Sequence, residues 1–214
     1  MSGHSNKHQI MSSLSPQPRL ILGSSSIYRK ELLSRLHLPF DVIMPDIDET
    51  PAANESPDAT ALRLAREKAT VIGRKNPNSL VIGSDQVATL DGEQIGKPGT
   101  HANALRQLQK MRGRKVVFHT ALCLFDSRTD ISSPQIQLEN VQTFVTFRHL
   151  PDAELDAYLR IEQPYDCAGS AKNEGLGIAI IEKLESSDPS ALTGLPLIAL
   201  TTMLRRAGVN FFGF

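Results

Sequence analysis

The sequence predicts an α/β fold with a mixed central sheet and helices on both of its sides. Short apolar runs that end at glycine or small polar residues are typical of buried strands. They alternate along the chain with segments whose apolar residues recur at helical spacing. The length of 214 residues allows one domain with an ample core, or two small ones.

The composition is that of an ordinary globular protein, with 40% hydrophobic and 21% charged residues. Lys and Arg number 23, as do Asp and Glu, so the net charge of zero gives no bulk electrostatic basis for binding a nucleic acid polymer or a membrane. No apolar run approaches the ~20 residues that cross a bilayer. Cys123 and Cys167 lie far apart, which suits a reducing compartment, and we expect a cytoplasmic location.

Residues 1–18 are polar and lack the apolar middle of a secretory signal, so we expect a disordered leader, with Met11 as an alternative start. Residues 19–208 are predicted to form the domain, and residues 209–214 a C-terminal tail.

The first predicted strand is Arg19–Gly23, followed by serines at 24–26 and by an amphipathic segment that starts near Tyr28. A strand, a small polar loop and a helix present backbone N–H groups and a helix N-terminus to phosphate. Arg29 and Lys30 lie in the first turn, where cations oppose the helix dipole. This favours a ligand-facing role for at least one of them; the alternative is a pair of solvated surface charges.

A second predicted strand, residues 39–44, leads into an acidic loop that prolines restrict. Its Asp46, Asp48 and Glu49 either bind a cation through oxygen ligands or form an exposed acidic surface. A helix is predicted from Ser56-Pro57, with Ser as N-cap and Pro at the first helical position, and it ends near Gly73. Its predicted buried residues are Leu62, Leu64, Ala65, Ala69 and Ile72.

The next strand, residues 80–83, is predicted to end at glycine, which would place Asp85 at its carboxyl end. Ligands bind at that end of open α/β sheets, and a carboxylate there can orient a water molecule or a metal ion. The alternative is that Asp85 only caps a turn. Asp91-Gly92 predicts a hairpin that returns Lys97 towards Asp85, as a phosphate site requires.

The remaining chain predicts helices and strands separated by one glycine-rich loop at residues 165–177, which permits close backbone approach. The predicted elements are a helix at 100–111, strands at 116–125 and 141–147, a helix from Pro151, a strand at 178–184 and a last helix from Asp188-Pro189. Cys167 in this loop is expected to be a buried free thiol and not a nucleophile.

Six motifs, taken in order over residues 19–208, resemble the Maf family of nucleotide pyrophosphatases. They are Gly23-Ser-Ser-Ser-Ile-Tyr-Arg-Lys30, Asp48-Glu-Thr-Pro51, Glu67-Lys-Ala69, Gly83-Ser-Asp85, Gly96-Lys-Pro98 and the late glycine-rich loop. Gln86 and the loop at 167–175 are similar to the branch of 7-methyl-GTP pyrophosphatases. One departure is Ser26-Ile-Tyr-Arg29, where many members have Ser-Pro-Arg-Arg, and we interpret it as a change of specificity.

The resemblance implies two lobes around a cleft and hydrolysis of a nucleoside triphosphate to a monophosphate and diphosphate. It also implies a divalent cation, Mg²⁺ or alternatively Mn²⁺, and by analogy a homodimer. The implied roles are Asp85 as general base and, with Glu49, as metal ligand; Ser24, Arg29, Lys68 and Lys97 as phosphate-binding groups; and Tyr28, Gln86 and Glu174 as selectors of the base.

Guanine offers two adjacent donors, N1–H and N2–H₂, which the Glu174 carboxylate could accept together. N7-methylation makes the purine cationic, and stacking on Tyr28 would then add a cation–π contribution of about 0.5–2 kcal/mol. Without the family, Tyr28 could equally be a core residue and Glu174 a surface charge. Two other functions stay open: a dTTP/UTP pyrophosphatase, and a nucleotide-binding regulator of cell division without turnover.

Overall fold

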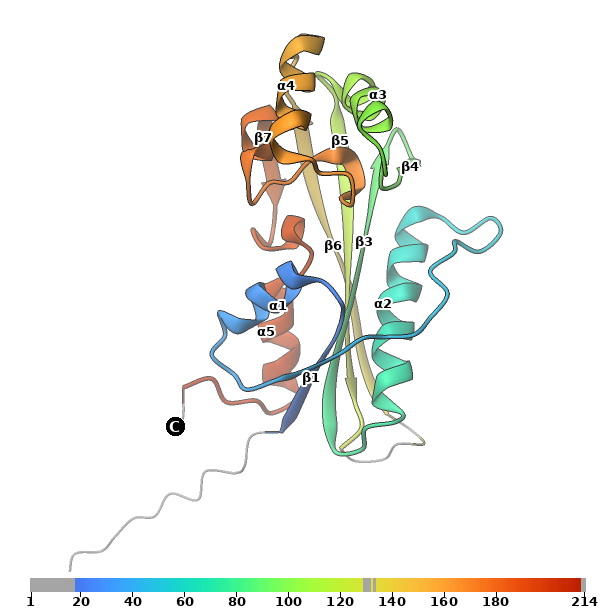
Figure 1. Ribbon diagram of the computed structural model, residues 1–214. Coiled ribbons are helices and arrows are strands. Elements are labelled where there is room, and N and C mark those ends of the chain that lie inside the picture. The colour runs from blue at the N-terminus through green and yellow to red at the C-terminus, as the bar shows by residue number, and fades with distance from the viewer. Residues whose placement is uncertain (1–17, 129–131, 133, 213–214) are drawn as a thin grey trace, which may run out of the picture.

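The computed structural model describes residues 18–128, 132 and 134–212 (Figure 1). Apart from Pro18, the predicted leader lies outside the described residues, as do positions 213–214 of the predicted tail. The strands are β1 (Arg19–Gly23), β2 (Asp41–Ile43), β3 (Ser79–Leu90), β4 (Glu93–Ile95), β5 (Lys115–Asp126), β6 (Gln135–Phe147) and β7 (Ile181–Ser186). The helices are α1 (Ile27–Ser34), α2 (Pro57–Gly73), α3 (His101–Met111), α4 (Asp152–Glu162) and α5 (Leu197–Arg206), with short 3₁₀ helices η1 (Ala168–Ser170), η2 (Leu176–Ile180) and η3 (Ala191–Thr193).

The described strands form one seven-stranded mixed sheet in the order β2-β1-β3-β5-β6-β7, with β4 paired to β3. β1 runs parallel to β2 and β3, whereas β5, β6 and β7 each run antiparallel to the strand before them in that order. The predicted α/β class with a mixed sheet is therefore confirmed. Among the described helices there is no candidate for a membrane span.

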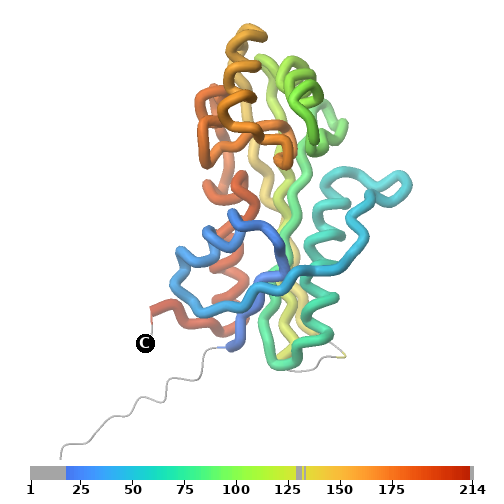
Figure 2. Tube along the Cα trace, in the orientation of Figure 1, coloured from blue at the N-terminus to red at the C-terminus, as the bar shows by residue number. Residues whose placement is uncertain are grey.

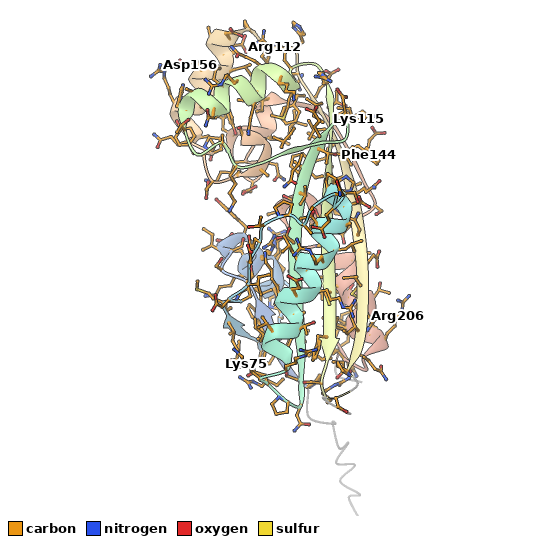
Figure 3. All side chains as sticks on the ribbon, turned by 90° about the vertical axis from the view of Figure 1, so that its right-hand side faces the viewer. Lys75, Arg112, Lys115, Phe144, Asp156 and Arg206 are labelled. Carbon is orange, nitrogen blue, oxygen red and sulfur yellow. The ribbon has the colours of Figure 1, made fainter. Side chains whose placement is uncertain are left out.

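The predicted two lobes are also present. The long strands β3, β5 and β6 run through the whole molecule, with α3, α4 and β7 at one end and α1, α2, α5 and β1 at the other (Figure 1). In the view turned by 90°, Arg112 and Asp156 mark the first lobe, and Lys75 and Arg206 mark the second (Figure 3). One core cluster fills the first lobe, and two fill the second, one on each face of the sheet.

The two faces of the second lobe follow from alternation along the strands. Leu80 and Ile82 face α1 and α5, whereas Val81 faces α2. The segment between β2 and α2 leads from the first of these faces to the second (Figure 2).

The strand β3 does not end at Gly83, as the sequence predicted, but continues to Leu90 because β5 pairs with it from Leu80 to Thr89. What ends at Gly83 is the pairing with β1, and β4 pairs with β3 only from Ala88 onward. Among the described pairings, residues 84–87 therefore have no partner strand on that edge. Asp85 lies in this gap in the middle of a strand, not beyond a strand end.

Three other boundaries differ from the predictions. β6 begins at Gln135, so the polar connection before it is shorter, and residues 176–180 are 3₁₀ helix that precedes β7. The last helix starts at Leu197 because Gly194, with φ of 108°, and Pro196 interrupt the chain before it. Asp188 instead accepts hydrogen bonds from the N–H groups of Ile198 (2.7 Å) and Ala199 (3.2 Å), and so caps α5 from outside the helix.

Gly83 allows α2 to lie directly on β3. A Cβ atom at Gly83 would lie 2.2 Å from the carbonyl oxygen of Ala65 and 2.7 Å from the amide nitrogen of Ala69. Both atoms belong to the helix backbone, which cannot turn aside as a flexible side chain does. A glycine is therefore needed for α2 to bring Lys68 close to the sheet.

Substituting Gly83→Ala is expected to push α2 off β3 and to lower the free energy of unfolding by about 1–3 kcal/mol, as overpacking does. Urea unfolding measures this change. Gly96→Ala is the matched control, because a Cβ atom at Gly96 would meet nothing within 4 Å. Equal losses of stability in the two variants would show that the close approach of α2 is unimportant.

Candidate active site

A cleft of about 600 Å³ lies beside the gap in β3 and is lined by residues from both lobes. This volume is within the range of small-molecule sites. Of the nine predicted site residues, all but Ser24 line it: Tyr28, Arg29, Glu49, Lys68, Asp85, Gln86, Lys97 and Glu174. The tertiary structure thus brings together groups from six separate segments of the chain.

The centre of the site is the buried ammonium of Lys68, whose side chain is 6% exposed. Its Nζ lies 2.7 Å from Oδ1 of Asp85 and 2.7 Å from Oε1 of Glu49. Three segments meet here: Lys68 comes from α2, Asp85 from β3, and Glu49 from the loop after β2. Both carboxylates are consequently close enough to each other to contact one cation.

The two carboxylates differ in basicity. Burial raises the pKa of Asp85, against the opposing charges of Lys68 and Arg29. Burial acts in the same direction on Glu49, but the hydrogen bond and charge of Lys68 outweigh it, and the pKa of Glu49 is lowered. Asp85 is therefore the better proton acceptor of the pair.

Arg29 is held at the cleft by two contacts. Its Nε donates to the carbonyl oxygen of Gly194 at 2.8 Å, and its Nη1 donates to Oγ of Ser24 at 3.4 Å. Ser24 is 2% exposed, and its Oγ also accepts from the N–H of Ser26 at 3.1 Å. Ser24 is thus buried against Arg29 and does not line the cleft, and its predicted phosphate-binding role stays a prediction.

Lys97 follows β4, is exposed, and has no ion-pair partner among the described residues. The hairpin at Asp91-Gly92 forms as predicted, with φ of 52° and 82° at its two central residues. It directs Lys97 to the cleft, where it joins Arg29 and Lys68. Three cations on one cleft suit a polyphosphate ligand.

The Gln86 amide has a fixed orientation. Its Nε2 donates to Oγ1 of Thr120 (2.9 Å) and to the carbonyl oxygens of Ala191 (3.1 Å) and Leu192 (3.1 Å). Thr120 donates its own hydroxyl proton to the Ala191 carbonyl at 3.0 Å, so it accepts from Gln86. The amide nitrogen is thereby occupied, and Oε1 is left as the group that Gln86 can offer to a ligand, an acceptor.

Tyr28 and Glu174 face the cleft from opposite lobes. The ammonium of Lys172 lies 5.8 Å from the centre of the Tyr28 ring, and it also lies 3.4 Å from Oε1 of Glu162. The Glu174 side chain reaches solvent, and the partial burial of its carboxylate raises its pKa against a hydrogen bond from its own backbone N–H. Its carboxylate is thus available to a ligand.

Several residues on or directly beside the cleft were not predicted from the sequence. Thr120 lies in the middle of β5, where nothing in the sequence marks it, and Lys172 and Asn173 were noted only as members of the glycine-rich loop. Gly194 offered a signal only as a glycine, the residue that most readily adopts the left-handed backbone conformation it has here, with φ of 108°.

Cys167 also lines the cleft, and the structure argues against a nucleophilic role. It is half-buried, and burial, with the neighbouring Asp166 carboxylate, raises its pKa to about 12. The thiol is therefore protonated at neutral pH, which agrees with the prediction that it is no nucleophile, but it is half-buried and not buried as predicted.

The described residues contain no group of three or more His, Cys, Asp or Glu side chains that could hold a metal ion. Glu49 and Asp85 provide two carboxylates at one place. This donor set fits Mg²⁺, which binds through one or two carboxylates together with substrate phosphates and retained waters.

The chain is similar to several known proteins. A solved structure, that of the Staphylococcus aureus Ham1 protein, shares the fold at 14% identity and a TM-score of 0.51, covering 88% of this chain and 99% of that one. Curated proteins named 7-methyl-GTP pyrophosphatase are far more similar. The protein from Cupriavidus metallidurans is 66% identical, covering 92% of this chain and 97% of its own length, and that from Ralstonia nicotianae is 64% identical, covering 92% and 99%. Residues 19–207 match the family model described as Maf-like protein, and the chain belongs to the Maf family.

Proposed function

We propose that this protein hydrolyses 7-methyl-GTP to 7-methyl-GMP and diphosphate, and so removes a modified nucleotide. The observation that carries the proposal is the pair of carboxylates on the buried Lys68 ammonium, in a cleft that also presents Arg29 and Lys97. The names of the relatives from Cupriavidus and Ralstonia support the choice of substrate. A homodimer and a cytoplasmic location stay predictions from the sequence.

In the proposed reaction a water molecule attacks the α-phosphorus in line with the bond to the departing diphosphate. Asp85 accepts the proton of that water, a role that its raised pKa favours. Arg29, Lys68 and Lys97 stabilise the charge that develops on the phosphate oxygens. Glu49 and Asp85 would hold a divalent cation, Mg²⁺ or Mn²⁺, which supplies further positive charge to these oxygens when bound.

Selection of the nucleobase would depend on hydrogen-bond acceptors in the cleft. Guanine presents N1–H and N2–H₂ as donors, and both the Glu174 carboxylate and the fixed Oε1 of Gln86 accept hydrogen bonds. The positive charge of a 7-methylated purine favours a site with a carboxylate and with the Tyr28 ring. In the free protein, Lys172 lies over that ring, so a base that stacks there would have to displace its ammonium.

Replacing Glu174 by Gln is expected to lower kcat/KM for 7-methyl-GTP by about 10- to 100-fold, because one acceptor for the guanine donors and one negative charge are lost. The measurement is diphosphate release from 7-methyl-GTP, GTP, dTTP and UTP, with and without Mg²⁺. Glu182→Gln, which alters an exposed carboxylate on β7, is the control. An unchanged order of substrates in Glu174→Gln would refute the proposed base recognition.

The same panel separates the other functions. A wild-type preference for dTTP or UTP would favour the pyrimidine nucleotide pyrophosphatase. Nucleotide binding without release of diphosphate would favour a regulator that does not hydrolyse its ligand.

A further inference from the structure

Glu49 reaches Lys68 from a segment that has no regular secondary structure, residues 44–56 between β2 and α2 (Figure 2). The Glu49 side chain is 57% exposed, so burial in a core does not hold it in place. Its position must therefore depend on polar contacts that fix the backbone around it. One of these contacts lies within the segment, where the N–H of Thr50 donates to Oδ1 of Asp48 at 2.9 Å.

The other contacts converge on one side chain of α2, Arg63. Its Nε donates to Oε1 of Glu55 at 2.8 Å, and its Nη2 donates to Oε2 of Glu55 at 2.9 Å. The same Nη2 donates to the carbonyl oxygen of Thr50 at 3.1 Å. Thr50 is the residue next to Glu49, so Arg63 fixes the backbone directly beside the carboxylate that contacts Lys68.

Glu55 completes the attachment of the segment. Its Oε2 also accepts from the N–H of Ala52 at 3.0 Å and from Oγ1 of Thr60 at 3.0 Å. The side chains of Arg63 and Glu55 are 27% and 11% exposed. The hydrogen bonds from Arg63, followed by that from the Ala52 N–H, lower the pKa of Glu55 to about 2, so the pair stays charged at neutral pH. A two-pronged contact between guanidinium and carboxylate resists rotation, which a single bond would allow.

We propose that Arg63 and Glu55 are positioning residues that set Glu49 against the Lys68 ammonium, and thereby assemble the two-carboxylate site. Neither residue lines the cleft. The inference rests on the proposed function only in assigning Glu49 to the active site. The helix α2 then has two tasks: Lys68 contacts the carboxylates, and Arg63, five positions earlier in the helix, holds the loop that supplies one of them.

The first test is a double-mutant cycle with Arg63→Met and Glu49→Gln. Arg63→Met alone is expected to lower kcat/KM for 7-methyl-GTP about 10-fold, since a small misplacement of a catalytic group is costly. In the Glu49→Gln background, Arg63→Met should cost less than about 2-fold, because the group it positions has already been removed. If the fold losses in kcat/KM of the two single variants simply multiply in the double variant, the proposal is overturned.

The second test does not depend on turnover. Amide hydrogen exchange in residues 49–55 should become at least about 10-fold faster in Arg63→Met, because the Thr50 and Glu55 contacts are lost. Calorimetric titration of the nucleotide-free protein with Mn²⁺ should show weaker binding. Unchanged exchange and unchanged Mn²⁺ binding would contradict the proposal. If wild-type protein does not hydrolyse 7-methyl-GTP, the proposed function fails, but the exchange experiment still tests the anchoring.

Arg128→Met is the matched control. Arg128 makes the same kind of contact elsewhere, from Nε and Nη2 to the two Asp126 oxygens at 2.8 and 2.7 Å, and from Nη2 to the Ala207 carbonyl at 2.6 Å. The side chains of Arg128 and Asp126 are 30% and 9% exposed, close to the values for Arg63 and Glu55. We expect Arg128→Met to leave exchange in residues 49–55 and kcat/KM unchanged. Glu55→Gln, which keeps the size of the side chain, replaces Arg63→Met in both tests if that variant does not fold.

Discussion

The Asp85→Asn variant is expected to stay folded and to lose roughly 10²- to 10⁴-fold in kcat, the range that general-base catalysis supplies. The amide has the shape of the carboxylate and an oxygen that can still accept from Lys68, whose Nζ also keeps its contact with Glu49 at 2.7 Å. It cannot take a proton from the attacking water. Measurement of diphosphate release, together with equilibrium binding of a non-hydrolysable nucleotide, separates the loss of chemistry from a loss of binding.

The pH dependence gives a second signature of Asp85. Burial raises its pKa, and a base works only in its ionised form. In the wild-type protein, kcat/KM should therefore fall as the pH is lowered through this raised value, at a pH above the ordinary Asp pKa of about 3.9. In the Asp85→Asn variant, this acidic limb of the pH profile, the fall of kcat/KM at low pH, should be absent.

Asp41→Asn is the control for Asp85→Asn, since Asp41 is an exposed carboxylate that pairs with Arg19 outside the cleft. It should keep wild-type turnover. The general-base assignment is wrong if Asp85→Asn turns over at the wild-type rate, or if its pH profile keeps the acidic limb.

The second large effect is expected for Lys68→Met. Removing this buried ammonium leaves Asp85 and Glu49 close together without a cation between them. Loss of one partner of a buried ion pair costs about 3–5 kcal/mol in the free energy of unfolding. Turnover should also fall by at least about 10²-fold, because a charge that stabilises the phosphate oxygens is lost.

The stability of Lys68→Met should depend on pH in a defined direction. Without Lys68, which lowers the pKa of Asp85 in the wild-type protein, that pKa rises further. Between about pH 4 and this raised value, the native state binds a proton that the unfolded chain releases. The free energy of unfolding should consequently fall as the pH rises through this interval, and more steeply than in the wild-type protein.

Urea unfolding at several pH values tests both statements about Lys68. Lys110→Met removes an exposed lysine that pairs with Glu93, and it should cost at most about 1 kcal/mol. If Lys68→Met has the stability of this control and the pH slope of the wild-type protein, the buried ammonium does not have the role assigned to it.

Local patterns in the sequence predicted most of the secondary structure. Ser-Pro at 56–57 predicted the start of α2, Asp91-Gly92 predicted the turn between β3 and β4, and apolar spacing predicted α3 and α4. The predicted element boundaries were wrong where residues distant in the sequence determine the structure. β3 passes through the polar residues 84–86 because β5 pairs along it, and α5 starts late because Gly194 and Pro196 turn the chain first.

The motifs also identified which residues form the candidate site, since all of them except Ser24 line the cleft. They did not reveal the contacts between these residues. Lys68 is 17 positions from Asp85, Gln86 is 105 from Ala191, and Arg29 is 165 from Gly194. Pairings over such separations depend on how the sheet and helices pack, which a local pattern does not contain.

The sequence by itself determined the α/β class, the order of the elements, and the residue types that handle phosphate and base. The tertiary structure alone decided that β1 stops pairing at Gly23, opposite Gly83, and that the pairing of β4 reaches only to Ile95, opposite Ala88, which leaves the edge of β3 uncovered at Asp85. It also decided that α2 lies against Gly83 and brings Lys68 to two carboxylates. The physical reason is that the gap, the burial and the raised pKa of Asp85 arise from neighbours in space, and a chain acquires these only when it packs.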